Sequence, residues 1–67
     1  MIKFKHNEKT NSTLLKIMGL TIGFDEVEFN EDALYLSFGG SIVACLEGEL
    51  QDEFVNHEYV KENSLVD

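Results

Sequence analysis

The fold is decided by residues 33–46, ALYLSFGGSIVACL, in which two apolar runs flank a pair of glycines. In the first run Leu34, Leu36 and Phe38 occupy alternate positions, which is the period-two pattern of a β-strand. Gly39 and Gly40 can both adopt positive φ, as the tight turn of a two-residue hairpin loop requires. The stretch therefore predicts a hairpin with strands at 33–38 and 41–46.

The predicted hairpin carries apolar side chains on both of its faces. A two-residue loop fixes the register, and it would place Leu36 opposite Val43 on one face and Tyr35 opposite Ala44 on the other. One face of so small a sheet can pack on the chain's own core, and the other face must be covered by a helix or by a second subunit, which is the main reason to expect a partner. The residues predicted to form this apolar interface are Tyr35, Ile42 and Leu46.

Upstream of the hairpin, residues 20–29 predict a further strand with an irregularity. The apolar residues are even-numbered from Leu20 to Phe24 and odd-numbered at Val27 and Phe29. A regular strand cannot make this change and keep one face dry, so a bulge or bend is expected near residues 25 and 26. With a turn at 30–32, residues 20–46 predict a three-stranded antiparallel meander.

The two ends of the chain give weaker patterns. Residues 2–6 alternate apolar and charged side chains, which predicts a short strand. Residues 13–18 predict a short helix, with Ser12 as its N-cap and Gly19 after its C-terminus, although Leu15 and Ile17 would also share one face of a strand. Residues 49–61 are predicted as a C-terminal helix with carboxylates in its first turn and Lys61 in its last, or as a strand over 54–60. Residues 63–67 are expected to fray.

Together these patterns predict one domain over residues 1–67 with an α+β fold. Its core is expected to be a small antiparallel β-meander with strands near 2–6, 20–29, 33–38 and 41–46. A short helix near 13–18 and a C-terminal helix near 49–61 would accompany the strands. The alternative is an all-β small barrel or sandwich.

Charge is the most pronounced feature of the composition, and it is unevenly placed. The 67 residues carry a formal net charge of −8. Residues 1–20 hold four of the five lysines and one glutamate, whereas residues 21–67 hold twelve of the thirteen acidic residues. A negative field repels nucleic acid and anionic lipid and attracts a basic protein surface. The densest acidic group, predicted as a partner-binding patch, is Asp25, Glu26, Glu28, Glu31 and Asp32.

No pattern in the sequence indicates catalysis, a cofactor or a metal. Gly39-Gly40 lies between two strands rather than before a helix, so it is not a phosphate-binding loop. Cys45 is the only cysteine, and it has no informative spacing to His6 or His57, so we expect it to be a small core residue. The acidic segment lacks the ligand spacing and the glycine of a helix-flanked calcium loop. We therefore expect a protein that is not an enzyme and holds no cofactor or metal.

Two functions fit these features. The first is a non-enzymatic inhibitor or adaptor that covers a basic surface, including one that binds nucleic acid, on a partner protein. The second is a homodimeric or larger structural subunit, whose acidity serves solubility only. With no signal peptide or long apolar segment, the expected location is the cytoplasm. In general type the chain is similar to small inhibitor or adaptor proteins of phages and other mobile elements, a similarity that rests on no motif.

Overall fold

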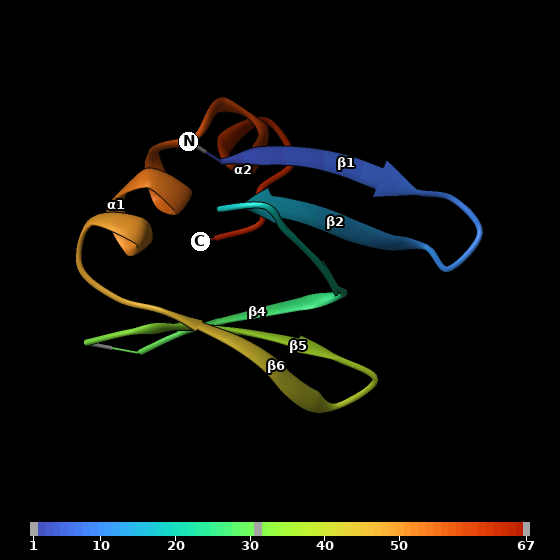
Figure 1. Cartoon of the computed structure of the whole chain (residues 1–67), viewed down its shortest axis with the longest axis horizontal. Coiled ribbons are helices and arrows are strands. Elements are labelled where there is room, and N and C mark those ends of the chain that lie inside the picture. The colour runs from blue at the N-terminus through green and yellow to red at the C-terminus, as the bar shows by residue number, and fades with distance from the viewer. Residues whose placement is uncertain (1, 31, 67) are drawn as a thin grey trace.

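In the computed structural model, which describes residues 2–30 and 32–66, two antiparallel sheets are joined to two short C-terminal helices (Figure 1). The first sheet contains, in this order, β1 (Lys3–Asn7), β2 (Ser12–Ile17) and β3 (Leu20–Phe24). The second contains β4 (Glu26–Phe29), β5 (Leu34–Phe38) and β6 (Ser41–Leu46). The helices are α1 (Glu49–Asn56) and α2 (Glu58–Glu62). The predicted α+β class with an antiparallel meander is confirmed.

The bend predicted near residues 25 and 26 is present, and it divides the stretch into two strands rather than adding one residue to a single strand. The stretch 20–29 is broken at Asp25 into β3 and β4, which belong to different sheets. Asp25 is tied to the second sheet, because its N–H donates to the Ser37 carbonyl at 2.9 Å and its Oδ2 accepts from the Gly39 N–H at 3.2 Å. The change of parity in the sequence thus marks the point where the chain passes from one sheet to the other.

The predicted helix near 13–18 is wrong, because this segment is strand β2 at the centre of the first sheet. Leu15 and Ile17 are buried on its inner side, as the strand alternative required. Met18 and Gly19 have φ values of 50° and 80° and form the turn to β3. Gly19, which suggested the C-terminus of a helix, is therefore part of a hairpin turn. The segment forms a strand because pairing with β1 and β3 outweighs the weak tendency of six residues to form a helix.

The β5–β6 hairpin is confirmed, but its predicted register holds only next to the turn. Phe38 lies opposite Ser41 and Ser37 opposite Ile42, as a two-residue loop dictates. A β-bulge then shifts the pairing, so that Leu36 lies opposite Ala44 and Leu34 opposite Leu46. Val43 is the extra residue. The shift moves Leu46 from the face predicted to bind a partner to the buried face, where it is only 4% exposed.

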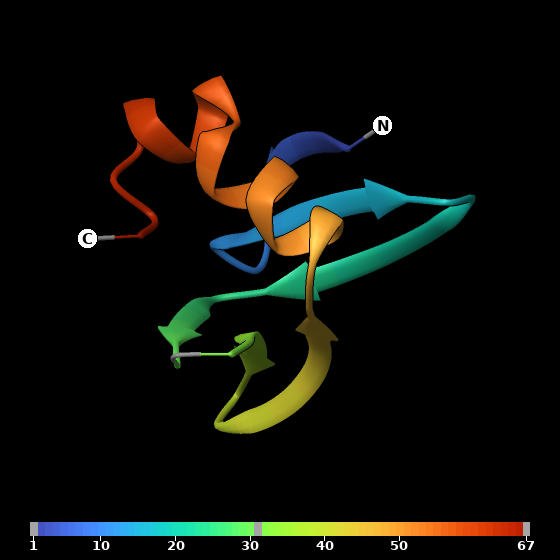
Figure 2. The ribbon, with the colours of Figure 1, turned by 90° about the vertical axis from the view of Figure 1, so that its left-hand side faces the viewer.

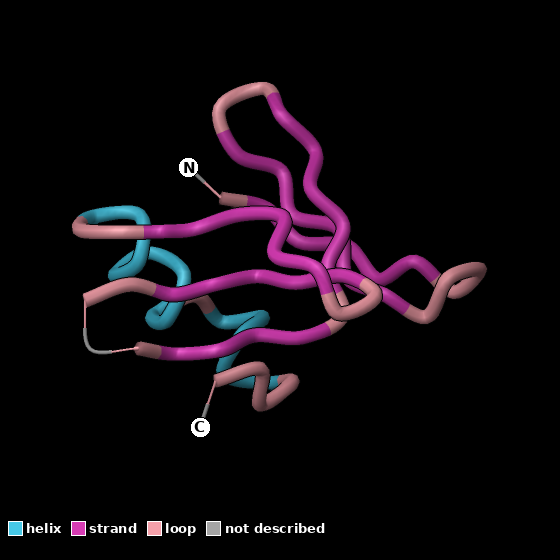
Figure 3. Tube along the Cα trace, turned by 90° about the horizontal axis from the view of Figure 1, so that it is seen from below, coloured by secondary structure: helices cyan, strands magenta, loops and turns pink. Residues whose placement is uncertain are grey.

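The C-terminal segment is helical, as predicted, but it is two helices rather than one. His57 lies between them in extended conformation, with φ −70° and ψ 138°. Its Nδ1 accepts a hydrogen bond from the Tyr59 N–H at 3.1 Å, so it caps α2 while ending α1. Both helices lie together at one end of the strands (Figures 1 and 3). None of the helices in the described part of the chain is long and apolar enough to cross a membrane.

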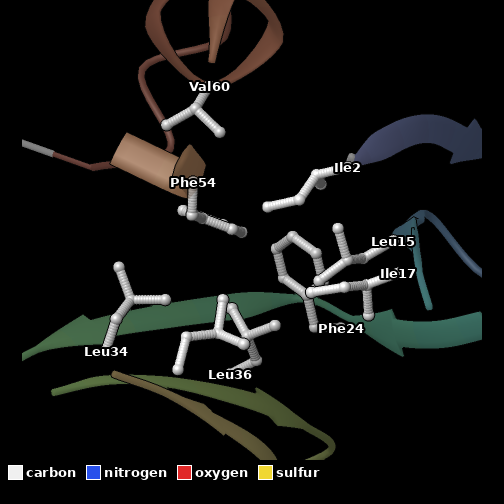
Figure 4. Close-up of a cluster of buried hydrophobic side chains, with 9 residues drawn as sticks. Ile2, Leu15, Ile17, Phe24, Leu34, Leu36, Phe54 and Val60 are labelled. Carbon is white, nitrogen blue, oxygen red and sulfur yellow. The ribbon is translucent and has the colours of Figure 1, made fainter. Parts of the chain in front are cut away.

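The core lies between the two sheets and the helices (Figures 2 and 4). Its largest fully buried side chains come from β2, β3, β5 and both helices: Leu15, Phe24, Leu34, Leu36, Phe54 and Val60. Leu65 and Val66, in the segment expected to fray, pack against this core. Because the inner face of each sheet is covered by the chain itself, the outer faces, the edge strands and the exposed sides of the helices remain open to other molecules.

Candidate functional site: two oppositely charged sheet faces

The outer face of the second sheet combines carboxylates with apolar side chains. The strand register aligns Glu28, Tyr35 and Cys45 in one row across the sheet and Glu26, Ser37 and Ile42 in the next. Residues directly opposite one another on neighbouring strands project to the same side. We call the surface formed by Glu26, Glu28, Tyr35, Ser37, Ile42 and Cys45 the acidic face.

The predicted acidic patch is only partly brought together. Glu26 and Glu28 lie side by side on the acidic face and are exposed. Asp25 is also exposed, but its Oδ2 is engaged by the Gly39 N–H. Asp32 is exposed in the turn at the other end of β4, and Glu31 lies outside the described residues. Two of the five carboxylates thus share one strand and one direction.

The residues of the predicted apolar interface are also only partly brought together. Tyr35 is half-buried and Ile42 is 66% exposed, and both lie on the acidic face. Leu46 does not, because the bulge at Val43 turns it into the core. Next to the face, the tip of the hairpin exposes Phe38 and Val43 by 42% and 46%. The exposed aliphatic side chain of the acidic face is therefore Ile42 rather than Leu46.

Cys45 is exposed, which corrects the expectation of a core residue. The bulge accounts for this, since it sets Cys45 opposite Tyr35 on the outer face. Its Sγ lies 3.7 Å from Glu47 Oε1 and donates to it. Desolvation by neighbouring groups, and then the negative charge of Glu47, raise the pKa of this thiol, while a hydrogen bond with Tyr35 lowers it. The net effect is a pKa above the ordinary value of a cysteine thiol.

The outer face of the first sheet is basic. Lys3 and Lys5 alternate along β1, and Lys16 on β2 lies directly opposite Lys3. All three are exposed. Like charges in directly opposite positions destabilise a sheet, so this arrangement is not explained by the stability of the fold. We call the surface formed by Lys3, Lys5, Lys16 and the half-buried Leu14 the lysine face.

A hollow of about 240 Å³ lies within the lysine face. It is lined by Lys3, Phe4, Lys5, Leu14, Lys16 and Thr21. Leu14 sits over Gly23, where an added Cβ would lie 3.5 Å from Leu14 Cδ2. The sequence does show the alternation of Lys3 and Lys5. It does not reveal that Lys16 joins them, because that depends on the pairing of β1 with a segment expected to be helical.

The two histidines and the cysteine do not converge. Cys45 is on β6 in the second sheet, whereas His6 is exposed on β1 in the first. The His57 Nε2 lies 3.2 Å from the Ile2 carbonyl, and its ring packs edge-on against Phe4 with centroids 4.8 Å apart. Across residues 2–30 and 32–66, no group of three or more His, Cys, Asp or Glu side chains is placed to hold a metal ion.

The chain is similar to no protein family, curated protein or solved structure with which it was compared. Its surfaces must therefore be interpreted from their own geometry. They present opposite charges on two different sheets, and each also carries an exposed or half-buried apolar side chain, Ile42 on the acidic face and Leu14 on the lysine face.

Proposed function

We propose that this chain is a non-enzymatic protein-binding module of the cytoplasm, an inhibitor or adaptor that covers a basic surface of a partner protein. The observation that carries the proposal is the composition of the acidic face. Glu26 and Glu28 point to the same side as Ile42, whose side chain is two-thirds exposed. The two carboxylates attract a basic partner electrostatically. Burial of the exposed aliphatic side chain in the interface adds hydrophobic stabilisation.

The size of the face defines how the partner must bind. A standard interface covers about 800 Å² on each partner, whereas three strands of five residues span only about 14 Å by 17 Å. The partner must therefore also contact the tip of the hairpin, where Phe38 and Val43 are exposed. Apolar contact at the tip and ionic contact along β4 would then act together.

The arrangement of the carboxylates favours one kind of basic surface. Residues 33–46 contain no Asp or Glu, so the acidic face has a single row of carboxylates along β4. Mimicry of a nucleic-acid duplex would need two rows. We therefore propose that the partner offers a basic strip with an apolar depression beside it, including a strip that otherwise binds single-stranded nucleic acid.

Capture with matched baits tests this proposal. The baits are the native protein, the variant Glu26→Gln/Glu28→Gln, and the control Glu53→Gln/Glu62→Gln, which removes the same charge from the helices. Support requires a basic protein that the native and control baits retain, that the β4 variant loses, and that 1 M salt releases by screening. Proteins retained equally by all three baits, or no retained protein, would reject the proposal.

A further inference from the structure

Strands β1 and β4 are both edge strands, and their free edges are complementary. In the described part of the chain β1 is hydrogen-bonded only to β2, and β4 only to β5. A free edge presents unpaired N–H and C=O groups that can template another strand. Within one molecule β1 and β4 belong to different sheets, so neither satisfies the other.

We propose that a second copy of this chain docks on β1, through antiparallel pairing of β1 with β4 of the neighbouring copy. β1 carries Lys3 and Lys5 on either side of Phe4, and β4 carries Glu26 and Glu28 on either side of Val27. In the register that sets Phe4 opposite Val27, Lys3 meets Glu28 and Lys5 meets Glu26. Opposite charges in directly opposed positions stabilise a pair of strands.

The apolar side of the same pairing is complementary too. Phe4 and Val27 are half-buried and pack against the core. Side chains that face each other across paired strands project to one side, so the pairing would bring these two inner faces together as a continuous surface. Phe29, which is 51% exposed at the end of β4, would lie at the margin of that surface. The new strand pair would therefore be ionic on its outer side and apolar on its inner side.

The charges also decide which edges can pair. Two β1 strands would oppose lysine to lysine, and two β4 strands would oppose glutamate to glutamate. Both arrangements are destabilising, and lysines on an edge strand ordinarily deter pairing for this reason. Only the combination of β1 with β4 turns these side chains from repulsive to attractive.

The proposed contact joins two different surfaces, so in a pair of copies each one still has a free β1 or β4 edge. Such an interface builds open chains or closed rings of copies. This inference goes beyond the proposed function because it needs no other protein. The self-association also bears on the proposed function, since a neighbouring copy would occupy Glu26 and Glu28 and so compete with a basic partner.

Charge reversal gives a direct test by sedimentation velocity. The variant Lys3→Glu/Lys5→Glu has only acidic edges, and the variant Glu26→Lys/Glu28→Lys has only basic edges. Each variant alone should need a concentration about tenfold higher than the native chain to associate. An equimolar mixture of the two should regain association, because every acidic edge then finds a basic one.

Matched controls separate edge pairing from net charge. The variants Lys9→Glu/Lys61→Glu and Glu53→Lys/Glu62→Lys make the same changes of net charge at positions outside β1 and β4, and each should associate as the native chain does. A native chain that stays monomeric up to about 1 mM, far above the dissociation constant of a specific interface, would overturn the inference. So would a mixture no more associated than its components, or controls weakened as much as the edge variants.

The reversed variants are expected to fold. Lys3→Glu replaces a like-charge pair with Lys16 by an opposite-charge pair, and Glu26 faces the uncharged Ser37. If circular dichroism shows that a reversed variant is unfolded, the neutral variants Lys3→Gln/Lys5→Gln and Glu26→Gln/Glu28→Gln replace it. Each should weaken association, and association unchanged in both would overturn the inference. The outcome is independent of the proposed function, since no partner protein is present.

Discussion

The rings of Phe4 and Tyr59 are stacked, with centroids 5.1 Å apart and planes 4° from parallel. Phe4 also meets Phe54 edge-on at 5.3 Å and His57 at 4.8 Å. One side chain of the first strand therefore contacts both helices and the residue between them. This cluster attaches the C-terminal helices to the first sheet, and through it supports the strand that carries the lysine face.

The substitution Phe4→Ala should destabilise the fold by about 2–3 kcal/mol, from lost burial and lost ring contacts. Tyr59→Ala removes one of those contacts and should cost about 1 kcal/mol. Urea unfolding monitored by circular dichroism measures both values. Equal free energies of unfolding for the native chain and Phe4→Ala would show that the ring cluster does not hold the helices on the sheet.

His57 should contribute through two hydrogen bonds that can be separated. Its Nδ1 caps α2 through the Tyr59 N–H, and its Nε2 lies 3.2 Å from the Ile2 carbonyl. His57→Ala removes both and should cost about 1–2 kcal/mol, whereas His57→Asn keeps a capping oxygen and should cost about half as much. The same unfolding measurement applies. Equal losses in the two variants would mean that the cap contributes nothing.

Met18 should be a site where substitution stabilises the protein. It is 82% exposed and adopts a φ of 50° in the β2–β3 turn. Asparagine tolerates this conformation better than methionine, and Asn-Gly is the preferred sequence of such a turn. Met18→Asn should raise the free energy of unfolding by about 0.5–1 kcal/mol. A lower melting temperature for this variant would show that Met18 makes contacts which the turn geometry does not indicate.

The reactivity of Cys45 should depend on Glu47. Thiolate, not thiol, is the reactive form, and desolvation and Glu47 raise the pKa of Cys45. Glu47→Gln removes a negative charge and leaves a neutral amide oxygen as a weaker acceptor for the Sγ hydrogen bond, so the pKa falls and the thiolate fraction at a fixed pH below it rises. Alkylation by iodoacetamide at pH 8 should therefore be faster than in the native chain. Glu49→Gln is the control, and a rate raised equally in both variants would contradict the role of Glu47.

The features of the fold that depend on neighbouring residues could be predicted from the sequence. The hairpin at Gly39-Gly40 is one example, because two adjacent glycines allow the positive φ that the turn requires. The bend at Asp25 is another, because the apolar residues change there from even to odd positions. The segment 12–17 leaves a helix and a strand as alternatives, because Gly19 fits either the end of a helix or a tight turn. The bulge at Val43 has no local signal, since the packing of Leu46 into the core decides it.

The candidate site could be predicted only in part, because it too depends on contacts between residues that are distant in the sequence. Closeness in the sequence suggested a patch of five acidic residues, but alternation along β4 brings only Glu26 and Glu28 to one side. The lysine face requires Lys3 and Lys16 to lie opposite each other. That relation joins distant parts of the chain, and it follows from strand pairing rather than from any local pattern.

We propose that the acidic face of the second sheet is the surface that meets a basic partner. The most direct measurement follows the backbone amide resonances of the ¹⁵N-labelled chain during titration with a short amphipathic peptide of lysine and leucine. The largest shifts are expected at Glu26, Glu28, Tyr35 and Ile42, and they should shrink as salt screens the ionic contacts. Shifts that instead concentrate on the carboxylates of α1 and α2, or spread evenly over all acidic residues, would contradict the claim.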